Sequence, residues 1–300
     1  MALFRKAAGV IALLAAAPLS ADAPSPLVLQ PATGWSVDYA DERCSLMRTF
    51  GEGEQSIRLQ VDSFGNPYRY RLLLVGKPLP HSAVRATGSI RYRLSPDSEP
   101  RQTATLEGRS NDLAAISFDS LFGPEFDWDS YTDATDAGRD SVRAQFLAGL
   151  GAYREKVDAI TLYMRGDRMI ELRLGRMTAP IAALETCIDD MYKSWGLDPA
   201  QTRALKRPPV PISATVRNLQ RRYPSDMILS GTNAYVPVRV MVDASGKPTG
   251  CAVQVQSVDA AFKEAVCAGM ARGFEPALDS DGRPVAAMFQ TAVLFLVNGA

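Results

Sequence analysis

Hydrophobic and polar residues alternate along much of the chain between residues 35 and 177. In residues 57–61 (IRLQV) and 90–94 (IRYRL), for example, every second residue is apolar. A period of two is typical of a strand with one buried and one solvated face. Strands are predicted over residues 35–41, 44–50, 55–64, 68–76, 89–95, 103–108, 114–121, 156–166 and 168–177. The pattern therefore predicts a β-rich, mostly antiparallel domain.

Residues 121–153 interrupt this alternation. An acidic and aromatic stretch comes first, and residues 141–153 (SVRAQFLAGLGAY) could then form a short helix. The acidic stretch is predicted to be a long surface loop.

An alternative for the acidic stretch is a calcium loop formed by Asp127, Asp129 and Asp133. The EF-hand pattern requires glycine at its sixth position and a bidentate glutamate at its twelfth. Thr132 and Gly138 occupy those positions. The missing ligands favour a solvated loop or a helix lead-in, so no metal site is predicted.

Residues 180–195 carry a strong helix signal. Pro180 lies in the first turn, and Gly196 follows as a C-cap. Apolar residues recur at helical spacing and must be buried on one face. They are Ile181, Leu184, Ile188, Met191, Tyr192 and Trp195.

Residues 198–211, and the run KRPPVP in particular, are polar and proline-rich, as is typical of a short linker. A proline run spans only about 3.1 Å per residue, so this linker would separate neighbouring domains rather than bridge a compartment. It divides a β-rich domain of unknown role, residues 24–197, from a second domain, residues 212–300.

The second domain has a different predicted order of elements. The order is helix (213–222), hairpin (238–242 and 251–255 around a turn at 243–246), helix (259–272) and strand (289–297). Ser213 can cap the first helix. Pro237 implies that the regular ladder starts after it or bulges there. The fold class predicted for the whole chain is α+β.

Composition limits the class of partner. The chain of 300 residues is 46% hydrophobic, which is enough for an ordinary core in one or two domains. Lys and Arg together number 33, as do Asp and Glu. Because these charges balance, the chain has no net electrostatic field that would favour nucleic acid or an anionic membrane, so neither partner is expected.

Residues 1–23 have the features of a secretory signal peptide. Arg5 and Lys6 are followed by the apolar run 7–19 and by the small-residue cleavage site ADA at 21–23. The alternative is an uncleaved inner-membrane anchor, which would need about 18 to 20 apolar residues. We therefore predict export to the periplasm, without stable membrane insertion after cleavage.

Four cysteines follow the signal segment: Cys44, Cys187, Cys251 and Cys267. In an oxidising compartment an even number of unclustered cysteines favours disulfides over a metal site. Three pairings are possible. We favour Cys44 with Cys187 and Cys251 with Cys267, because each pair then closes within one candidate domain.

Recognisable catalytic motifs are missing from the sequence. The only histidine is His81, beside a proline-flanked turn, and there is no G-x-S-x-G, no phosphate-binding glycine loop and no H-E-x-x-H. A hydrolase using paired carboxylates is a less favoured alternative. We predict a non-catalytic protein that needs no cofactor.

The second domain also carries a set of motifs spread from residue 223 to residue 297. The most specific are an initial Tyr-Pro, a turn glycine, and Phe-x-Pro-Ala followed by Gly-x-Pro-Val. In this chain they are Tyr223, Pro224, Gly246, Phe274, Pro276, Ala277 and the run GRPV at 282–285. Together they resemble the TonB C-terminal domain family, over about a quarter of the chain.

The resemblance implies a small helix-on-sheet domain that binds a short extended peptide, the TonB box of an outer-membrane transporter. Binding adds the peptide as a strand to the sheet edge. The last strand is the candidate edge, and its candidate partner-binding residues are Met288, Phe289, Gln290, Thr291, Ala292, Val293 and Leu294. The side chains of this strand can be buried on one face of the sheet while its backbone pairs with a guest. Side chains occupy the faces of a sheet, whereas strand addition uses the backbone groups at its edge.

This chain differs in two features from the force-transducing members of that family. A transducer needs an inner-membrane helix and a long proline-rich spacer, whereas this chain has a cleavable signal and only KRPPVP. Force transmission is therefore not expected. Two hypotheses follow for the second domain: recruitment of an extended peptide from an envelope protein, or a structural or assembly module whose edge pairs with itself or is covered.

Overall fold

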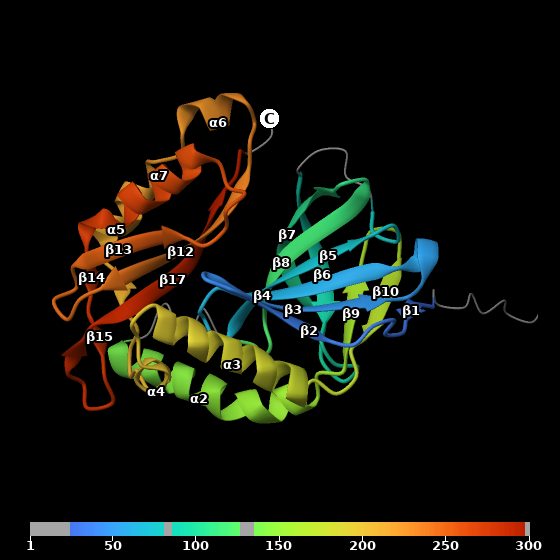
Figure 1. Cartoon of the computed structure of the whole chain (residues 1–300), viewed down its shortest axis with the longest axis horizontal. Coiled ribbons are helices and arrows are strands. Elements are labelled where there is room, and N and C mark those ends of the chain that lie inside the picture. Colours follow the sequence, from blue (N-terminus) through green and yellow to red (C-terminus); the bar gives the residue numbers. More distant parts are fainter. Residues whose placement is uncertain (1–24, 81–85, 127–134, 298–300) are drawn as a thin grey trace, which may run out of the picture.

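Two packed units make up the protein, whose computed structural model describes residues 25–80, 86–126 and 135–297. The first unit is built on one large curled sheet, and the second on a small three-stranded sheet (Figure 1). The protein is mixed α+β and strand-rich, and at this level the predicted fold class is confirmed.

The large sheet has ten strands in the order β1-β10-β9-β6-β7-β8-β5-β4-β3-β2. Their bounds are β1 Leu27–Leu29, β2 Ser36–Ala40, β3 Arg43–Phe50, β4 Ile57–Ser63, β5 Arg69–Gly76, β6 Ala86–Arg93, β7 Arg101–Ser110, β8 Leu113–Leu121, β9 Ala159–Tyr163 and β10 Met169–Arg173. All neighbours are antiparallel except β1 and β10. Every strand predicted for this sheet is present, and β1 is an addition, because three residues are too few to show a period.

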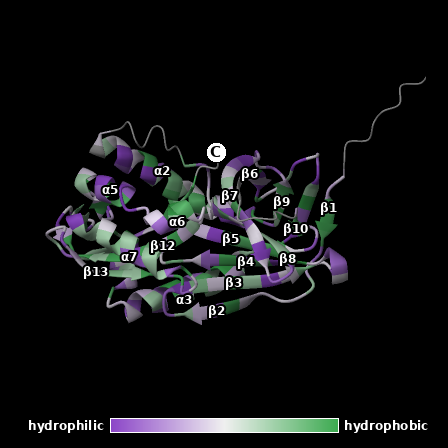
Figure 2. Ribbon diagram, turned by 90° about the horizontal axis from the view of Figure 1, so that it is seen from above, coloured by the Kyte–Doolittle hydropathy of each residue, from purple (hydrophilic) through white to green (hydrophobic). Residues whose placement is uncertain are grey.

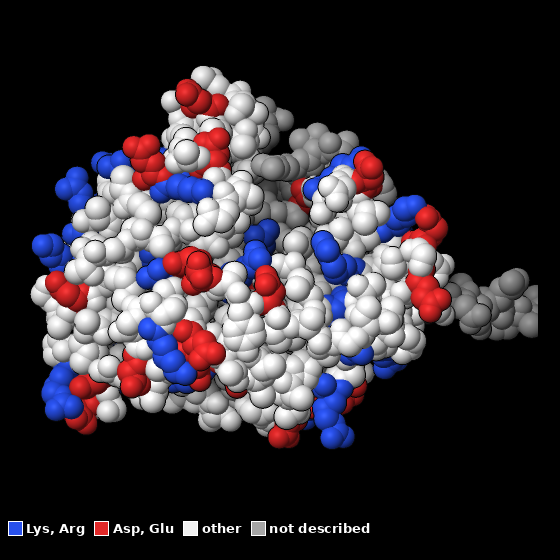
Figure 3. Space-filling view, viewed as in Figure 1, with Lys and Arg blue, Asp and Glu red and all other residues white. Residues whose placement is uncertain are grey.

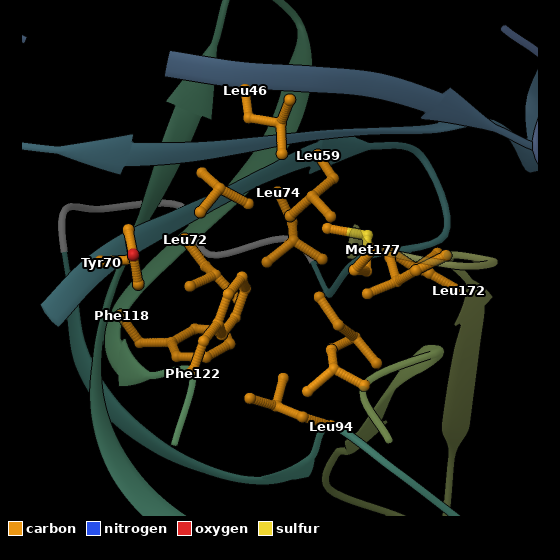
Figure 4. Close-up of a cluster of buried hydrophobic side chains, with 14 of the residues drawn as sticks. Leu46, Leu59, Tyr70, Leu72, Leu74, Leu94, Phe118, Phe122, Leu172 and Met177 are labelled. Atoms are coloured by element: carbon orange, nitrogen blue, oxygen red, sulfur yellow. The ribbon is translucent and has the colours of Figure 1, made fainter. Parts of the chain in front are cut away.

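The apolar positions of these strands form a core inside the curl of the sheet. Leu46, Leu59 and Leu72 are fully buried there, together with the buried ring of Phe118 (Figure 4). Burial of one such leucine stabilises the fold by about 1.5–3 kcal/mol. Hydrophobic and hydrophilic residues are interspersed along the strands, as the period of two requires (Figure 2).

Helix α2 (Asp136–Glu155) is longer than the short helix predicted over residues 141–153. The Thr135 hydroxyl accepts a hydrogen bond from the Gly138 N–H at 3.4 Å and caps the helix, which therefore begins within the acidic stretch that we predicted as a loop. Other residues considered above lie outside the described part of the chain: His81, Asp127, Asp129, Thr132 and Asp133.

Helix α3 (Thr178–Ser194) is the predicted helix that closes the first unit. Its apolar face belongs to the core of the large sheet. Cys187 of α3 is bonded to Cys44 of β3, with Cα atoms 6.0 Å apart, so the first predicted disulfide ties the helix to the sheet. Arg154, in the last turn of α2, pairs with Glu185 of α3 at 2.6 Å.

The segment predicted as a linker is ordered. It contains α4 (Pro199–Arg203), where Arg203 pairs with Asp189 of α3 at 2.6 Å. It ends in β11 (Val210–Pro211), which pairs with β14 (Phe274–Glu275) of the second unit. The segment therefore packs against both units, because its side chains and backbone find partners in each.

The second unit places helices on one face of its small sheet (Figure 1). Its elements are α5 Ser213–Gln220, α6 Ser225–Leu229, β12 Ala234–Val242, β13 Pro248–Val253, α7 Ala260–Gly269, β15 Ala277–Leu278, β16 Pro284–Val285 and β17 Ala287–Phe295, with β14 between α7 and β15. β12 is central, and β13 and β17 flank it antiparallel.

The predicted cap at Ser213 is wrong. Ile212 holds the cap position of α5, no side chain caps the helix, and Ser213 lies in its first turn. The reason is that the extended chain is fixed one residue earlier, where the Ile212 N–H donates to the Gly273 carbonyl at 3.3 Å.

Pro237 affects only one of the two ladders of β12. The ladder with β13 starts after it, at Val238 opposite Val253, as predicted. The ladder with β17 runs through Pro237 without a register shift. Proline is tolerated in this central strand because its missing N–H would point to the β13 side, just beyond the end of that strand.

Cys251 of β13 and Cys267 of α7 form the second predicted disulfide, with Cα atoms 5.7 Å apart. This bond fastens the helix layer of the second unit to its sheet. No cysteine is left free.

The surface carries no dominant charge on the face drawn in Figure 3, where acidic and basic side chains are interspersed. In the described ranges, none of the helices combines the length and hydrophobicity that a membrane span requires.

Candidate functional site

The outer edge of β17 is the candidate binding edge. Within the described ranges β17 pairs only with β12, in a continuous register from Ala234 opposite Phe295 to Val242 opposite Ala287. One row of β17 backbone groups therefore points away from the sheet.

The direction of these groups follows from a hydrogen bond on the other side of β12. The Gln254 N–H donates to the Pro237 carbonyl at 2.9 Å, so the backbone of Pro237 faces the β13 side. Successive strand residues direct their N–H and C=O groups to alternate neighbours. Val238 consequently faces β17, where it pairs with Thr291. The β17 residues whose backbone groups face outward are Met288, Gln290, Ala292 and Leu294.

The helix-covered face of the small sheet holds the core of the second unit. Val238 and Val240 are fully buried there beside Phe262 of α7. Phe289 and Phe295 of β17 pack against the same core. Alternate β17 side chains thus anchor the strand without using its outer backbone groups.

The other face of the small sheet packs against the first unit. The Tyr235 hydroxyl donates to the Asp119 carboxylate of β8 at 2.8 Å, and the Arg71 guanidinium lies 4.4 Å from the centre of the Tyr235 ring. Burial, followed by the nearby Asp119 charge, raises the pKa of Tyr235. The phenol is protonated at neutral pH in any case, and the raised pKa keeps it a donor at higher pH than an ordinary tyrosine.

Arg239 of β12 makes the second contact between the units. Its guanidinium donates two hydrogen bonds to the Glu42 carboxylate, at 3.1 and 2.5 Å, and lies 4.2 Å from the centre of the Trp195 ring. The indole N–H of Trp195 donates to the Asp41 carbonyl at 3.1 Å. The Arg239 and Glu42 side chains are 12% and 24% exposed, so this bidentate pair is partly shielded from solvent.

Met288 extends the contact to the edge strand itself. Its side chain is 8% exposed and belongs to the hydrophobic core of the first unit. Nearby, the Gln254 side-chain amide donates to the Phe64 carbonyl at 2.8 Å. Together with the Tyr235 and Arg239 contacts, these fix the position of β17 relative to the first unit.

A cavity of about 330 Å³ lies beside the first half of β17. We call it the junction cavity, because both units and the segment between them line it. Its apolar walls include Tyr68, Phe146, Leu147, Tyr192, Pro209 and Met288. Arg69 and Arg143 also line it, and no acidic residue of the described chain does.

A larger hollow of about 770 Å³ lies between the β7–β8 hairpin and the α6 end of the second unit. Charged residues of both signs line it, including Glu107, Arg109 and Asp259. Such a mixed lining does not point to one class of ligand.

Tyr223 and Pro224 secure the end of β17 rather than its outer edge. The Tyr223 hydroxyl donates to the Thr232 carbonyl at 2.9 Å, and its ring lies edge-on to Phe295 with centres 5.2 Å apart. Pro224 holds the position before α6. The pair therefore fixes the connection that leads into β12.

Gly246 and Phe274 join the hairpin turn to the segment before β17. The Phe274 N–H donates to the Gly246 carbonyl at 2.8 Å, and Gly246 has a φ of +85°. The Phe274 ring lies 5.2 Å from that of Phe289 in β17. Pro276 and the fully buried Ala277 continue this packed segment. Of these motif residues, Phe274 packs directly against β17.

The structure places all seven predicted partner-binding residues in β17, with Met288, Gln290, Ala292 and Leu294 directed outward through their backbones. Sequence reasoning missed the first-unit residues beside the edge, such as Phe146. Periodicity identifies a buried helix face, but it does not say which strand of another unit lies opposite.

No group of three potential metal ligands occurs among the described residues. Comparison with family models, curated proteins and solved structures found no match to this chain.

Proposed function

We propose that this is a non-catalytic periplasmic protein that binds an extended peptide of an outer-membrane transporter or another envelope partner. The peptide adds as a fourth strand to the outer edge of β17, in the manner of the TonB C-terminal domain that the sequence resembles. The observation that carries the proposal is the row of outward backbone groups on Met288, Gln290, Ala292 and Leu294.

Other properties of the chain support this proposal. The order of α5, the β12–β13 hairpin, α7 and β17 suits a TonB-like domain. Two disulfides and the absence of a membrane-spanning helix in the described ranges are compatible with an exported protein. The segment between the units packs against both of them, which suits a binding module better than a force-transmitting spacer.

Backbone pairing alone gives only part of the affinity. A net contribution of about 0.5–1.5 kcal/mol per hydrogen bond is partly offset by ordering the peptide. Side-chain contacts beside the edge must therefore supply selectivity.

Titration of the chain from residue 24 onward with N-terminal peptides of outer-membrane transporters tests the proposal. We expect saturable binding that is lost in Ala292→Pro, because proline removes an outward N–H. Ala292→Val retains that N–H and should bind normally. A peptide with N-methyl groups on the residues that face β17 should fail against the unaltered protein.

The competing function is an assembly module whose edge pairs with a second copy. In that case no peptide binds, and the unaltered chain is a dimer that Ala292→Pro converts to a monomer. Either finding would contradict peptide recruitment.

A further inference from the structure

The lining of the junction cavity includes Met288 and Gln290, two residues whose backbone groups face outward from β17. Residues directly opposite each other in paired strands share a face of the sheet. Gln290 and Arg239 are such a pair, and Arg239 faces the first unit. A guest residue paired with Gln290 therefore also directs its side chain toward the first unit, where the junction cavity lies.

The size and walls of this cavity fit one large apolar side chain. Its volume of about 330 Å³ can hold an aromatic ring. Phe146 of α2 and Tyr192 of α3 contribute buried rings, and the Tyr192 hydroxyl is already used as a donor to the Gly65 carbonyl. Aromatic side chains prefer such edge and offset contacts and bury a large area. The walls thus favour an aromatic guest residue over a polar one.

The charged residues at the cavity favour a carboxylate. Arg69 is held by Asp119 at 2.5 Å. Arg143 has a different environment, because it donates to a neutral group, the Lys206 carbonyl, at 3.0 Å. A partly buried guanidinium beside a neutral acceptor can still form charge-assisted hydrogen bonds with an acid.

Because this inference rests on the proposed strand addition at β17, its guest is an extended segment of an envelope protein. We infer that the junction cavity selects a guest with an aromatic side chain opposite Gln290 and an Asp or Glu two residues away, on the same face of the strand, that pairs with Arg143. Recognition is then shared between the units. The second unit supplies the backbone edge, and the first unit supplies the pocket and the cation.

A displayed library of ten-residue peptides, selected against the chain from residue 24 onward, tests this inference. We expect the binders to share one aromatic position and one acidic position two residues away from it, because these two side chains lie on the same face of a strand. Replacing the aromatic residue by Ala should weaken binding about tenfold or more, as for a buried anchor residue. Replacing the acid by its amide should weaken binding about fivefold or more, as expected for a lost charge-assisted hydrogen bond.

Variants of the protein identify the cavity as the source of that preference. Leu147→Trp and Thr202→Trp fill it from two different helices, and each should abolish the preference for an aromatic residue. Gln145→Trp is the control on α2, because Gln145 is exposed and does not line the cavity. Arg143→Gln should abolish the preference for acid over amide, whereas the exposed Arg176→Gln should not.

The outcomes separate this inference from the proposed function. If peptides bind, Ala292→Pro abolishes binding, and both cavity-filling variants leave the peptide preference unchanged, the cavity inference is overturned while strand addition stands. If no peptide binds the unaltered chain, both fail.

Discussion

At Gly246 the hairpin turn comes so close to the chain before β17 that any side chain would collide with it. A Cβ at this position would lie 2.0 Å from the Phe274 carbonyl oxygen, and the φ of +85° disfavours other residues. We predict that Gly246→Ala lowers the free energy of unfolding by about 2–4 kcal/mol, through strain and overpacking.

Gly282→Ala is the matched control for this prediction. Gly282 has a similar φ of +80°, but a Cβ added there would have no other atom within 4 Å. Its replacement should cost only about 1–2 kcal/mol for the backbone conformation. Urea denaturation of both variants measures the difference, and equal losses would show that the Phe274 contact is unimportant.

Tyr70 makes the stability of the first unit sensitive to alkaline pH. Its side chain is fully buried, and burial raises the pKa of its phenol to about 12 from an ordinary 10.0. A raised folded-state pKa contributes stability that is complete below pH 10 and is lost as the pH rises toward 12. We predict a loss of about 2–3 kcal/mol across that window.

Comparison with Tyr70→Phe isolates this contribution. The variant lacks the phenol that donates to the Pro67 carbonyl at 2.8 Å, so it should be about 1 kcal/mol less stable at pH 7. Its stability should fall less steeply than that of the unaltered chain between pH 10 and 12. Parallel curves, measured by urea denaturation at each pH, would assign the alkaline loss to other groups.

The two disulfides, each of which joins a helix to a strand, differ in their exposure to solvent. Cys44 and Cys187 are 0% and 2% exposed, whereas Cys251 is exposed on β13. Thiol–disulfide exchange needs access to a sulfur atom. We predict that mild reductant opens the Cys251–Cys267 bond in the folded protein while Cys44–Cys187 stays closed, as measured by alkylation and mass spectrometry.

The consequences of the two bonds should also differ. The Cys44–Cys187 bond closes a separation of 143 residues and the Cys251–Cys267 bond one of 16. In the loop-entropy model these closures are worth about 4–5 and about 3 kcal/mol. Replacing Cys44 and Cys187 by Ala should therefore cost more stability than replacing Cys251 and Cys267. Alkylation of Cys44 first under mild reduction would contradict the assigned accessibility.

An element could be predicted where its own sequence carries a period, and could not be predicted where it depends on partners far away in the chain. The strands of the large sheet follow from alternation, because one face of each is buried in a common core. β14, β15 and β16 could not be predicted, since two residues carry no period. The start of α2 was not predicted, because the residues that follow Thr135 are polar. The cap that Thr135 provides is nevertheless enough to begin the helix there.

Across the whole molecule, the contact between the two units is the feature that the sequence pattern conceals. Arg239 lies among alternating valines, which indicates a solvated position, yet its side chain is paired with Glu42 and stacked on Trp195. Tyr235 and Met288 likewise face the first unit. Alternation shows that a strand has two unlike faces, but it cannot show that a polar face meets a complementary surface formed by residues far away in the chain. The position of β17 at the edge of the small sheet was expected from the family resemblance, whereas nothing in the sequence pattern indicated the junction cavity.

These contacts predict that the two units remain associated when the chain is cut between them. A cut after Ala204 is suitable, because Arg207 bridges to Leu278 and β11 pairs with β14, so the following segment belongs with the second unit. Co-expressed chains of residues 24–204 and 205–300 should therefore elute together in gel filtration. The second chain alone exposes Tyr235 and Met288, and it should self-associate.

Arg239→Gln tests whether the partly buried Arg239–Glu42 ion pair holds the two chains together. The variant leaves Glu42 without its bidentate partner, so the affinity between the chains should fall about 10- to 100-fold. Arg217→Gln on the exposed surface of α5 should leave it unchanged. If residues 205–300 instead form a stable monomer that elutes apart from the first chain, the face of β12 and β17 is not held against the first unit. The junction cavity could not then select a guest strand, because the walls that the first unit contributes would not lie beside β17.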